Sequence, residues 1–302
     1  MRFVRFDSPE KGARLGYLRD DSSVIDFTTA SSGRFTSFLD LLVEGNSKQL
    51  PLVDVVTSLL KGESAPERYS YTDLAHLPAG KNTEHLLLPL LPPEVWAAGV
   101  TYKRSVEARM EESQVHDVYD RVYHAERPEI FFKSTAKRVI GYGQNLGLRS
   151  DSKSIIPEPE LGLVLGFNRE IVGYIIGNDL TTRDIEGENP LYLPQAKIFK
   201  NSCALGPIVA TCEAVANPYD LEITCDIVRS DQLVFSDKAN TAQLKRKLEN
   251  LVQFLGRDNL IFPGTVLLTG TCIVPPDSFS LMAGDIVKIG IEPMGVLVNP
   301  VG

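Results

Sequence analysis

Two glutamates separated by a single proline are the residues of this chain best suited to chemistry. Glu158 and Glu160 alternate with Pro157 and Pro159, and proline favours an extended backbone at its own position and at the position before it. In an extended segment, residues two positions apart point to the same side, so both carboxylates can face one point. Two carboxylates held that close repel each other unless a positive charge lies between them. The pair therefore predicts a site for a hard divalent cation with oxygen ligands.

A third carboxylate, Asp179, closely follows the apolar run 171–176. That run predicts a strand, and a neighbouring strand could bring Asp179 to the other two carboxylates. The alternative is that Glu158 and Glu160 lie on the solvated face of an edge strand, and spacing alone leaves the two interpretations open. Oxygen ligands bind several hard cations, so we expect Mg²⁺, with Mn²⁺ and Ca²⁺ as alternatives.

The overall charge restricts the partners that this chain can have. A formal net charge of −8 argues against nucleic acid or an anionic membrane as the main partner. No apolar run approaches the roughly 20 residues that span a bilayer, and the N-terminal residues lack the apolar core of a signal peptide. The 4 cysteines form no C-x-x-C pair and the 4 histidines show no metal-ligand spacing. We therefore expect a cytoplasmic protein with reduced thiols and no zinc site.

Short strands and a few helices must position the acidic residues. Residues 1–90 predict a small N-terminal α+β domain, and Leu91-Pro92-Pro93 predicts its boundary because consecutive prolines stop regular structure. Residues 91–302 predict a mainly β domain whose regular strand spacing favours a closed or rolled sheet over a βαβ architecture. Its predicted helices cover 103–112, which could continue to 122, and 244–255, with Thr241 as N-cap and Gly256 as the stop.

Further motifs accompany the acidic residues in a fixed order along the chain. They are Gln195-Ala196-Lys197-Ile198-Phe199, Leu205-Gly206-Pro207 and Leu268-Thr269-Gly270-Thr271. Together with the acidic motifs, this set resembles the fumarylacetoacetate hydrolase family over residues 93–300. The resemblance implies a rolled β-sheet (a β-roll or mixed barrel) in the C-terminal domain and one divalent metal that acts on 2-oxo acids. Members of the family cut C–C bonds, decarboxylate, isomerise or dehydrate such acids.

Four more segments resemble the branch of the family that dehydrates 2-keto-3-deoxy-D-arabinonate to 2,5-dioxopentanoate. They are residues 127–133, 149–152, 188–195 and 269–275. That branch has a small N-terminal domain as well, so the resemblance plausibly extends over the whole chain. It implies a hydro-lyase of pentose catabolism that takes a 2-oxo-3-deoxy sugar acid.

By position, the resemblance makes Glu158, Glu160 and Asp179 the metal ligands. Some hydrolases of the family supply a fourth carboxylate just before the tyrosine that matches Tyr102, but Thr101 stands there in this chain. Three carboxylates leave about three octahedral positions for water and a chelating 2-oxo acid. The metal is then expected to act as a Lewis acid on the 2-oxo group.

The resemblance implies that Lys197 and Glu129 are the catalytic residues. Lys197 matches a family lysine near the metal, where a lowered pKa suits a base or a charge-stabilising donor. Without the resemblance, a surface lysine on a polar loop is the simpler interpretation. Glu129 is expected to exchange protons at C3 and C4 of the substrate. The alternative for Glu129 is a buried structural carboxylate paired with Arg127 or Lys133. Which residue is the base and which the acid stays open.

The substrate-binding residues that we expect are Ser105, Phe132, Lys133, Tyr192 and Thr271. Ser105 and Tyr192 are candidates to read the C5 hydroxyl, and Thr271 to bind the substrate carboxylate or a metal-bound water. The Thr269–Thr271 segment can also be read as a plain turn after a strand. Arg183 and Asp184 are expected to brace Asp179 without touching the substrate.

One departure from the family pattern bears on the reaction. Hydrolases of this family carry a histidine three residues after the tyrosine that matches Tyr102, and a glutamate three residues further on; here these positions are Ser105 and Ala108. Without that pair to activate water, dehydration is favoured over C–C hydrolysis of a 2,4-dioxo acid. A non-catalytic sugar-acid-binding protein is the alternative from another class. The resemblance also implies a homodimer or homotetramer.

Overall fold

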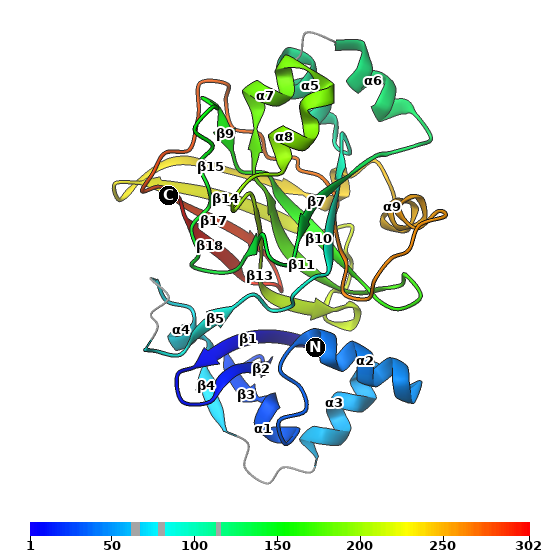
Figure 1. Cartoon of the computed structure of the whole chain (residues 1–302), viewed down its shortest axis with the longest axis vertical. Coiled ribbons are helices and arrows are strands. Elements are labelled where there is room, and N and C mark those ends of the chain that lie inside the picture. The colour runs from blue at the N-terminus through cyan, green and yellow to red at the C-terminus, as the bar shows by residue number, and fades with distance from the viewer. Residues whose placement is uncertain (62–66, 78–81, 113–115) are drawn as a thin grey trace.

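The computed structural model describes residues 1–61, 67–77, 82–112 and 116–302, and its strands form three sheets (Figure 1). The largest sheet has 12 strands, and ten of them follow the order β4-β3-β2-β1-β13-β11-β10-β16-β6-β7, with β5 paired to β1 and β8 to β13. These strands are β1 (Arg2–Ser8), β2 (Gly12–Leu18), β3 (Ser23–Asp26), β4 (Arg68–Ser70), β5 (His85–Leu87), β6 (Glu94–Gly99), β7 (Glu129–Thr135), β8 (Val139–Ile140), β10 (Pro159–Leu165), β11 (Ile171–Asp179), β13 (Cys203–Thr211) and β16 (Val266–Leu268).

The second sheet has 4 strands in the order β15-β14-β17-β18, and the third pairs β9 with β12. Their bounds are β14 (Glu222–Arg229), β15 (Gln232–Asn240), β17 (Ile286–Ile291), β18 (Val296–Pro300), β9 (Ile155–Ile156) and β12 (Thr181–Thr182). The fold is therefore a strand-rich mixture of α and β, as the sequence predicts. Each sheet has a terminal strand at both ends of its order among the described residues, so the sheets are open and not closed into a barrel.

The main sheet runs across the predicted domain boundary at residues 90/91. β1 pairs with β13 in the register Arg2↔Ala210 and Phe3↔Val209. One buried cluster joins Phe3 and Phe38 from the N-terminal part to Leu268 near the site. Burying these side chains together stabilises both parts at once. The division into 1–90 and 91–302 stays a prediction about folding units.

Short helices cover the sheets and connect them. They are α1 (Phe27–Ala30), α2 (Phe38–Lys48), α3 (Leu52–Leu60), α4 (Tyr71–Leu74), α5 (Lys103–Glu112), α6 (His116–His124), α7 (Arg183–Glu188), α8 (Leu193–Lys197) and α9 (Leu248–Leu255), with 3₁₀ turns η1 (Pro190–Tyr192), η2 (Cys212–Ala214) and η3 (Thr241–Gln243). In Figure 1, α5 to α8 gather at one end of the molecule, opposite α2 and α3. None of the helices in the described part of the chain is long and apolar enough to cross a bilayer.

The helix predicted over 244–255 begins later than its apolar pattern indicates. Asn240, not Thr241, caps the short turn η3 by accepting from the amide of Ala242, and α9 starts only at Leu248. The amide of Lys245 donates to the carbonyl of Thr101 at 3.1 Å. This long-range contact uses an amide that the predicted helix would have needed, so a tertiary interaction outweighs the local helical pattern.

Candidate active site and metal centre

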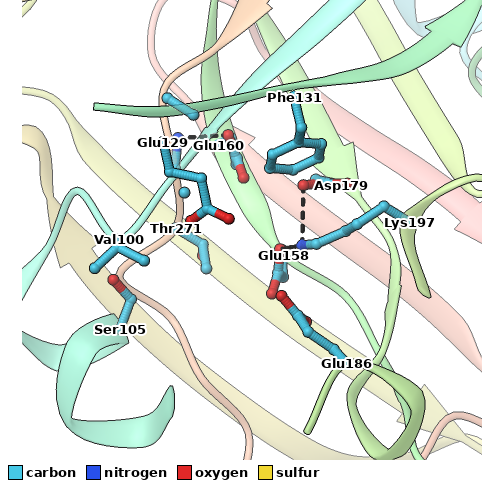
Figure 2. A pocket seen from close by; sticks show the side chains of 13 residues that line it. Val100, Ser105, Glu129, Phe131, Glu158, Glu160, Asp179, Glu186, Lys197 and Thr271 are labelled. Carbon is cyan, nitrogen blue, oxygen red and sulfur yellow. Dashed lines mark hydrogen bonds and ion pairs between the residues drawn. The ribbon is translucent and has the colours of Figure 1, made fainter. Parts of the chain in front are cut away.

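Three buried carboxylates meet where β10 and β11 pair. Glu160 on β10 lies opposite Gly177 on β11. Asp179 ends β11, and its amide donates to the carbonyl of Glu158 at 3.0 Å. The amide of Glu158 in turn donates to Oδ1 of Asn178 at 3.1 Å. These bonds hold one oxygen from each of Glu158, Glu160 and Asp179 within 4.8 Å of one another. Figure 2 shows the three side chains in the wall of one pocket.

The electrostatics of these three carboxylates favour a bound cation. Glu158, Glu160 and Asp179 are at most 4% exposed. Burial, together with the charges of Asp179 and Glu158, raises the pKa of Glu160 well above its usual value. The amide of Gly270 donates to Glu160 at 2.6 Å, which stabilises the charged form only in part. A buried carboxylate in this position is costly unless a cation neutralises it.

Two buried lysines partly balance the charge and surround Asp179. Lys133 pairs with Asp179 at 2.6 Å and Lys197 pairs with it at 3.1 Å, while Lys197 also pairs with Glu158. Burial acts to raise the pKa of Asp179, but the charges and hydrogen bonds of the two lysines outweigh it, so the pKa lies below its usual value. Asp179 is therefore ionised and ready to act as a ligand at neutral pH.

The donor set suits a hard divalent cation. The three acids offer only carboxylate oxygens, which Mg²⁺, Mn²⁺ and Ca²⁺ prefer over nitrogen or sulfur ligands. A cation beside Glu160 would offset the burial and the two neighbouring carboxylates that raise its pKa. Glu158, Glu160 and Asp179 would hold the ion, in agreement with the ligands that the family resemblance implies.

Binding of the metal is expected to depend on pH through Glu160. Because its pKa is raised in the metal-free protein, the carboxyl keeps its proton to a higher pH than usual, and that proton must leave before a metal can bind. We expect Mg²⁺ to bind more weakly at pH 6 than at pH 8, with release of a proton on binding. Titration calorimetry in buffers of different ionisation enthalpy measures both. Equal affinity at the two pH values without proton release would contradict this prediction.

Glu129 faces the three carboxylates from the start of β7, on the opposite wall of the pocket (Figure 2). β7 pairs with β6 in the register Gly99↔Glu129. A Cβ atom on Gly99 would lie 2.1 Å from Oε2 of Glu129. The glycine therefore leaves the space into which the Glu129 carboxyl folds.

The change Gly99→Ala is expected to displace Glu129 without unfolding the protein. The clash involves the end of a flexible side chain, so the free energy of unfolding should change little. A shift of about 1 Å in a reacting group can cost about 100-fold in rate, so we expect kcat to fall by about that factor. Steady-state kinetics and a Mg²⁺ titration test this, with metal affinity expected to stay unchanged. A variant with the parent's kcat would contradict the role of Gly99.

Several of the other predicted residues also line the pocket. Ser105 and Thr271 lie in its wall, together with Phe131 and Val100. The hydroxyl of Ser105 donates to the carbonyl of Tyr102 at 2.7 Å, one turn back along α5. The family's water-activating histidine would stand at position 105, and the side chain at position 108 lies outside the described part of the chain.

Three predicted substrate-binding residues are not in the wall of this pocket. Phe132 packs edge-on against Trp96, with ring centroids 5.4 Å apart, because alternate residues of β7 point to opposite faces. Lys133 is fully buried and donates to the carbonyls of Leu180 and Lys197. It therefore supports Asp179 from outside the pocket wall. Tyr192 is 37% exposed in the turn η1.

Arg183 and Asp184 bind groups outside the carboxylate cluster. Both terminal nitrogens of Arg183 donate to the carbonyl of Pro275 at 3.1 Å. Asp184 accepts from the hydroxyl of Ser152 and from the amide of Lys153. Two buried lysines pair with Asp179 and supply the opposite charge that a buried carboxylate needs. A supporting role of Arg183 and Asp184 for Asp179 stays a prediction.

Glu186 is a pocket residue that the sequence analysis did not single out. It lies on α7, is 4% exposed and lines the pocket beside Glu158 (Figure 2). The hydroxyl of Thr181 donates to its Oε2 at 3.2 Å. Glu186 follows Arg183 by three residues, so both lie on the same face of a helix. This spacing is the signal in the sequence that could have marked Glu186 as a site residue.

Comparison with known proteins agrees with this geometry. The sequence profile described as fumarylacetoacetate (FAA) hydrolase C-terminal matches residues 94–302. The chain belongs to the fumarylacetoacetate hydrolase family. The matched region holds every residue of the metal cluster and of the pocket around it.

Relatives and a solved structure place the chain near one branch of that family. It is 46% identical over 224 residues to 2-dehydro-3-deoxy-D-arabinonate dehydratase of Saccharolobus solfataricus, covering 73% of this chain and 75% of the relative. It is 48% identical over 217 residues to a probable 2-keto-3-deoxyxylonate dehydratase of Haloferax volcanii, covering 72% and 75%. A structure of 2-keto-3-deoxy-D-arabinonate dehydratase with magnesium and 2,5-dioxopentanoate superposes with a TM-score of 0.82 and 35% identity, over all of this chain and 98% of the other.

Proposed function

We propose that this protein is a magnesium-dependent dehydratase that converts 2-keto-3-deoxy-D-arabinonate to 2,5-dioxopentanoate and water. The observation that carries the proposal is a single pocket that joins a three-carboxylate metal site to a lysine on one side and a glutamate on the other. The dehydratases named above support it, because their names state this substrate class and a related structure contains the metal and the product.

The names of the two relatives are consistent with one substrate. Removing the C3 hydroxyl and oxidising C2 leaves C4 as the only stereocentre of a 2-keto-3-deoxypentonate. C4 has the same configuration in D-arabinonate and D-xylonate, so the D form of the second relative's substrate is the same molecule as that of the first. The proposal therefore commits to that five-carbon acid.

The side chains of the pocket supply the proton transfers that dehydration needs. When bound, the metal supplies Lewis-acid polarisation of the 2-oxo group. In the proposed reaction Lys197, as its neutral amine, removes a proton from C3, and the protonated carboxyl of Glu129 donates a proton to the C4 hydroxyl, which leaves as water. Loss of a proton from C5 and gain of one at C3 then move the double bond to C4–C5. Protonation of this enol at C4, with loss of its O–H proton, gives the C5 aldehyde. Atoms balance, since one proton and one hydroxide leave as water.

The positions of Lys197 and Glu129 fit the proposed roles of base and acid. Lys197 lies beside the carboxylates, bonded to Glu158 and Asp179, where the metal-chelated end of a 2-oxo acid must bind. Glu129 faces them from the other wall, where C4 of such an acid would lie. Ser105 stands where family hydrolases place the histidine that activates water. This arrangement favours loss of water over C–C hydrolysis.

The function is tested by incubating the pure protein and Mg²⁺ with each rival substrate. Formation of 2,5-dioxopentanoate from the deoxy acid, followed by proton NMR, supports the proposal. Pyruvate release from a 2,4-dioxo acid, with no aldehyde from the deoxy acid, would identify a hydrolase instead. Binding of the deoxy acid without turnover would indicate a sugar-acid-binding protein. A homodimeric or homotetrameric assembly and a cytoplasmic location stay predictions.

A further inference from the structure

The segment 243–247, from the last residue of η3 to the residue before α9, binds two of the segments that form the pocket wall. The thiol of Cys272 donates to Oε1 of Gln243 at 3.0 Å, directly beside Thr271. The amide of Lys245 donates to the carbonyl of Thr101 at 3.1 Å, one turn before Ser105. Neither contact is local in the sequence, so segment 243–247 ties together parts of the pocket that the sheet alone does not join.

The next residue, Arg246, binds a third segment through four carbonyl groups. Its Nη1 donates to the carbonyl of Glu126 at 2.9 Å. Its Nη2 lies 2.7 Å from the carbonyl of Ala125, 3.2 Å from that of Val122 and 3.4 Å from that of Arg127. The last carbonyls of a helix have no partner within the helix, and α6 ends at residue 124. A planar guanidinium suits several such acceptors at once.

Lys245 reinforces this contact from the same segment, 243–247. Its Nζ donates to the carbonyl of Tyr123 at 2.6 Å and lies 3.8 Å from the centroid of the Tyr123 ring. Positive charge at the C-terminal end of a helix is favourable because the helix dipole is negative there. The two basic residues therefore fix the end of α6 and the turn that follows it.

The segment held by Arg246 leads directly to Glu129. Only Pro128 stands between Arg127 and Glu129, which is the first residue of β7. The end of a strand frays more easily than its middle. On one side, pairing with Gly99 sets the position of Glu129. On the other side, the position depends on the turn that Arg246 binds.

We infer that Arg246 is a positioning residue for the reaction, which holds the carboxyl of Glu129 at the substrate through the carbonyl groups of residues 122–127. The inference rests on the proposed role of Glu129 as the proton donor. Arg246 does not line the pocket itself. Its effect should therefore appear in turnover and not in metal binding, since the proposed metal ligands lie on β10, at the end of β11 and at the residue just before β10.

The test uses Arg246→Ala and Arg246→Lys, with Lys247→Ala as a control on an exposed neighbouring side chain. For Arg246→Ala we expect kcat to fall by about 10- to 100-fold, with Mg²⁺ affinity unchanged. Added guanidinium ion should restore part of the rate, and Arg246→Lys should lie between that variant and the parent. The control should keep the parent's kcat. A parental kcat in Arg246→Ala would overturn the inference.

A double-mutant cycle separates positioning from a general loss of structure. If Arg246 acts through Glu129, then Arg246→Ala should slow the parent but add no loss to Glu129→Gln. A loss of the same factor in both backgrounds would overturn the inference and indicate a structural role.

A measurement without substrate distinguishes a failure of the inference from a failure of the proposed function. Hydrogen exchange of the backbone amides of residues 125–131 should be faster in Arg246→Ala than in the parent, while the amides of β10 stay unchanged. If the parent does not dehydrate the deoxy acid, the proposed function fails, and the exchange experiment still decides whether Arg246 holds this segment. Unchanged exchange would overturn the inference.

Discussion

Replacing Glu160 by glutamine is expected to abolish Mg²⁺ binding and dehydration while leaving the metal-free protein at least as stable at pH 8. Burial and two neighbouring carboxylates raise the pKa of Glu160, so its charged form costs stability above that pKa. An amide of the same shape removes this cost and can still accept from the amide of Gly270. The loss of a metal ligand should lower kcat/KM at least about 1,000-fold, which corresponds to about 4 kcal/mol.

The matched variant Asp179→Asn should lose activity as well but behave differently in stability. Asp179 pairs with Lys133 and Lys197, both buried. Removing one partner of a buried ion pair typically costs about 3–5 kcal/mol, because the remaining charge is left uncompensated. Thermal unfolding of the metal-free proteins at pH 8 compares the two variants. Equal destabilisation by Glu160→Gln and Asp179→Asn would contradict this account of the three carboxylates. Undiminished activity of the parent protein in the presence of a strong chelator would contradict it as well.

Replacing Lys197 by methionine is expected to lower kcat by about 100- to 10,000-fold, the range typical of a lost general base. Metal binding should persist, because the substitution removes the ammonium group that competes with the cation for the carboxylates of Glu158 and Asp179. Mg²⁺ is therefore expected to bind at least as tightly as in the parent. Loss of activity with metal affinity retained separates this variant from Glu160→Gln. Lys200→Met, on an exposed side chain, is the control and should have parental activity.

Exchange of the methyl protons of pyruvate in D₂O identifies the base directly. Pyruvate carries the 2-oxo acid group but no C4 hydroxyl, so only the removal of a C3 proton is observed. The parent and Glu129→Gln should exchange these protons, and Lys197→Met should not. Undiminished exchange by Lys197→Met, or its loss only in Glu129→Gln, would assign the base to Glu129 instead.

The meeting of the three carboxylates could be predicted from the sequence because their arrangement is largely local. Prolines on either side of Glu158 favour an extended chain, and period-two alternation places Glu160 on the same side. A single antiparallel pairing, Pro159↔Asn178, then brings Asp179 to them. Only one long-range contact, the pairing of β10 with β11, is therefore required to bring the three carboxylates together, and the strand pattern was strong enough to indicate it.

The residues that hold these carboxylates could not be predicted in the same way. Whether Phe131 or Phe132 faces the pocket depends on the register of β7 against β6, and a shift of one residue exchanges them. The part played by Lys133 depends on three acceptors that come from distant parts of the chain, among them Asp179. Nothing in the residues around Lys133 distinguishes it from a substrate ligand.

The sequence by itself therefore determined the strand-rich fold and the family to which the chain belongs, and it predicted that three carboxylates would gather as candidate metal ligands. These depend on local backbone preference and on motifs read in order along the chain. Only the tertiary structure decided that the main sheet crosses the predicted domain boundary, that Glu186 lines the pocket and that Arg246 binds the turn before Glu129. Each of these follows from contacts between residues far apart in the chain, whose closure depends on the packing of the whole fold and not on local pattern.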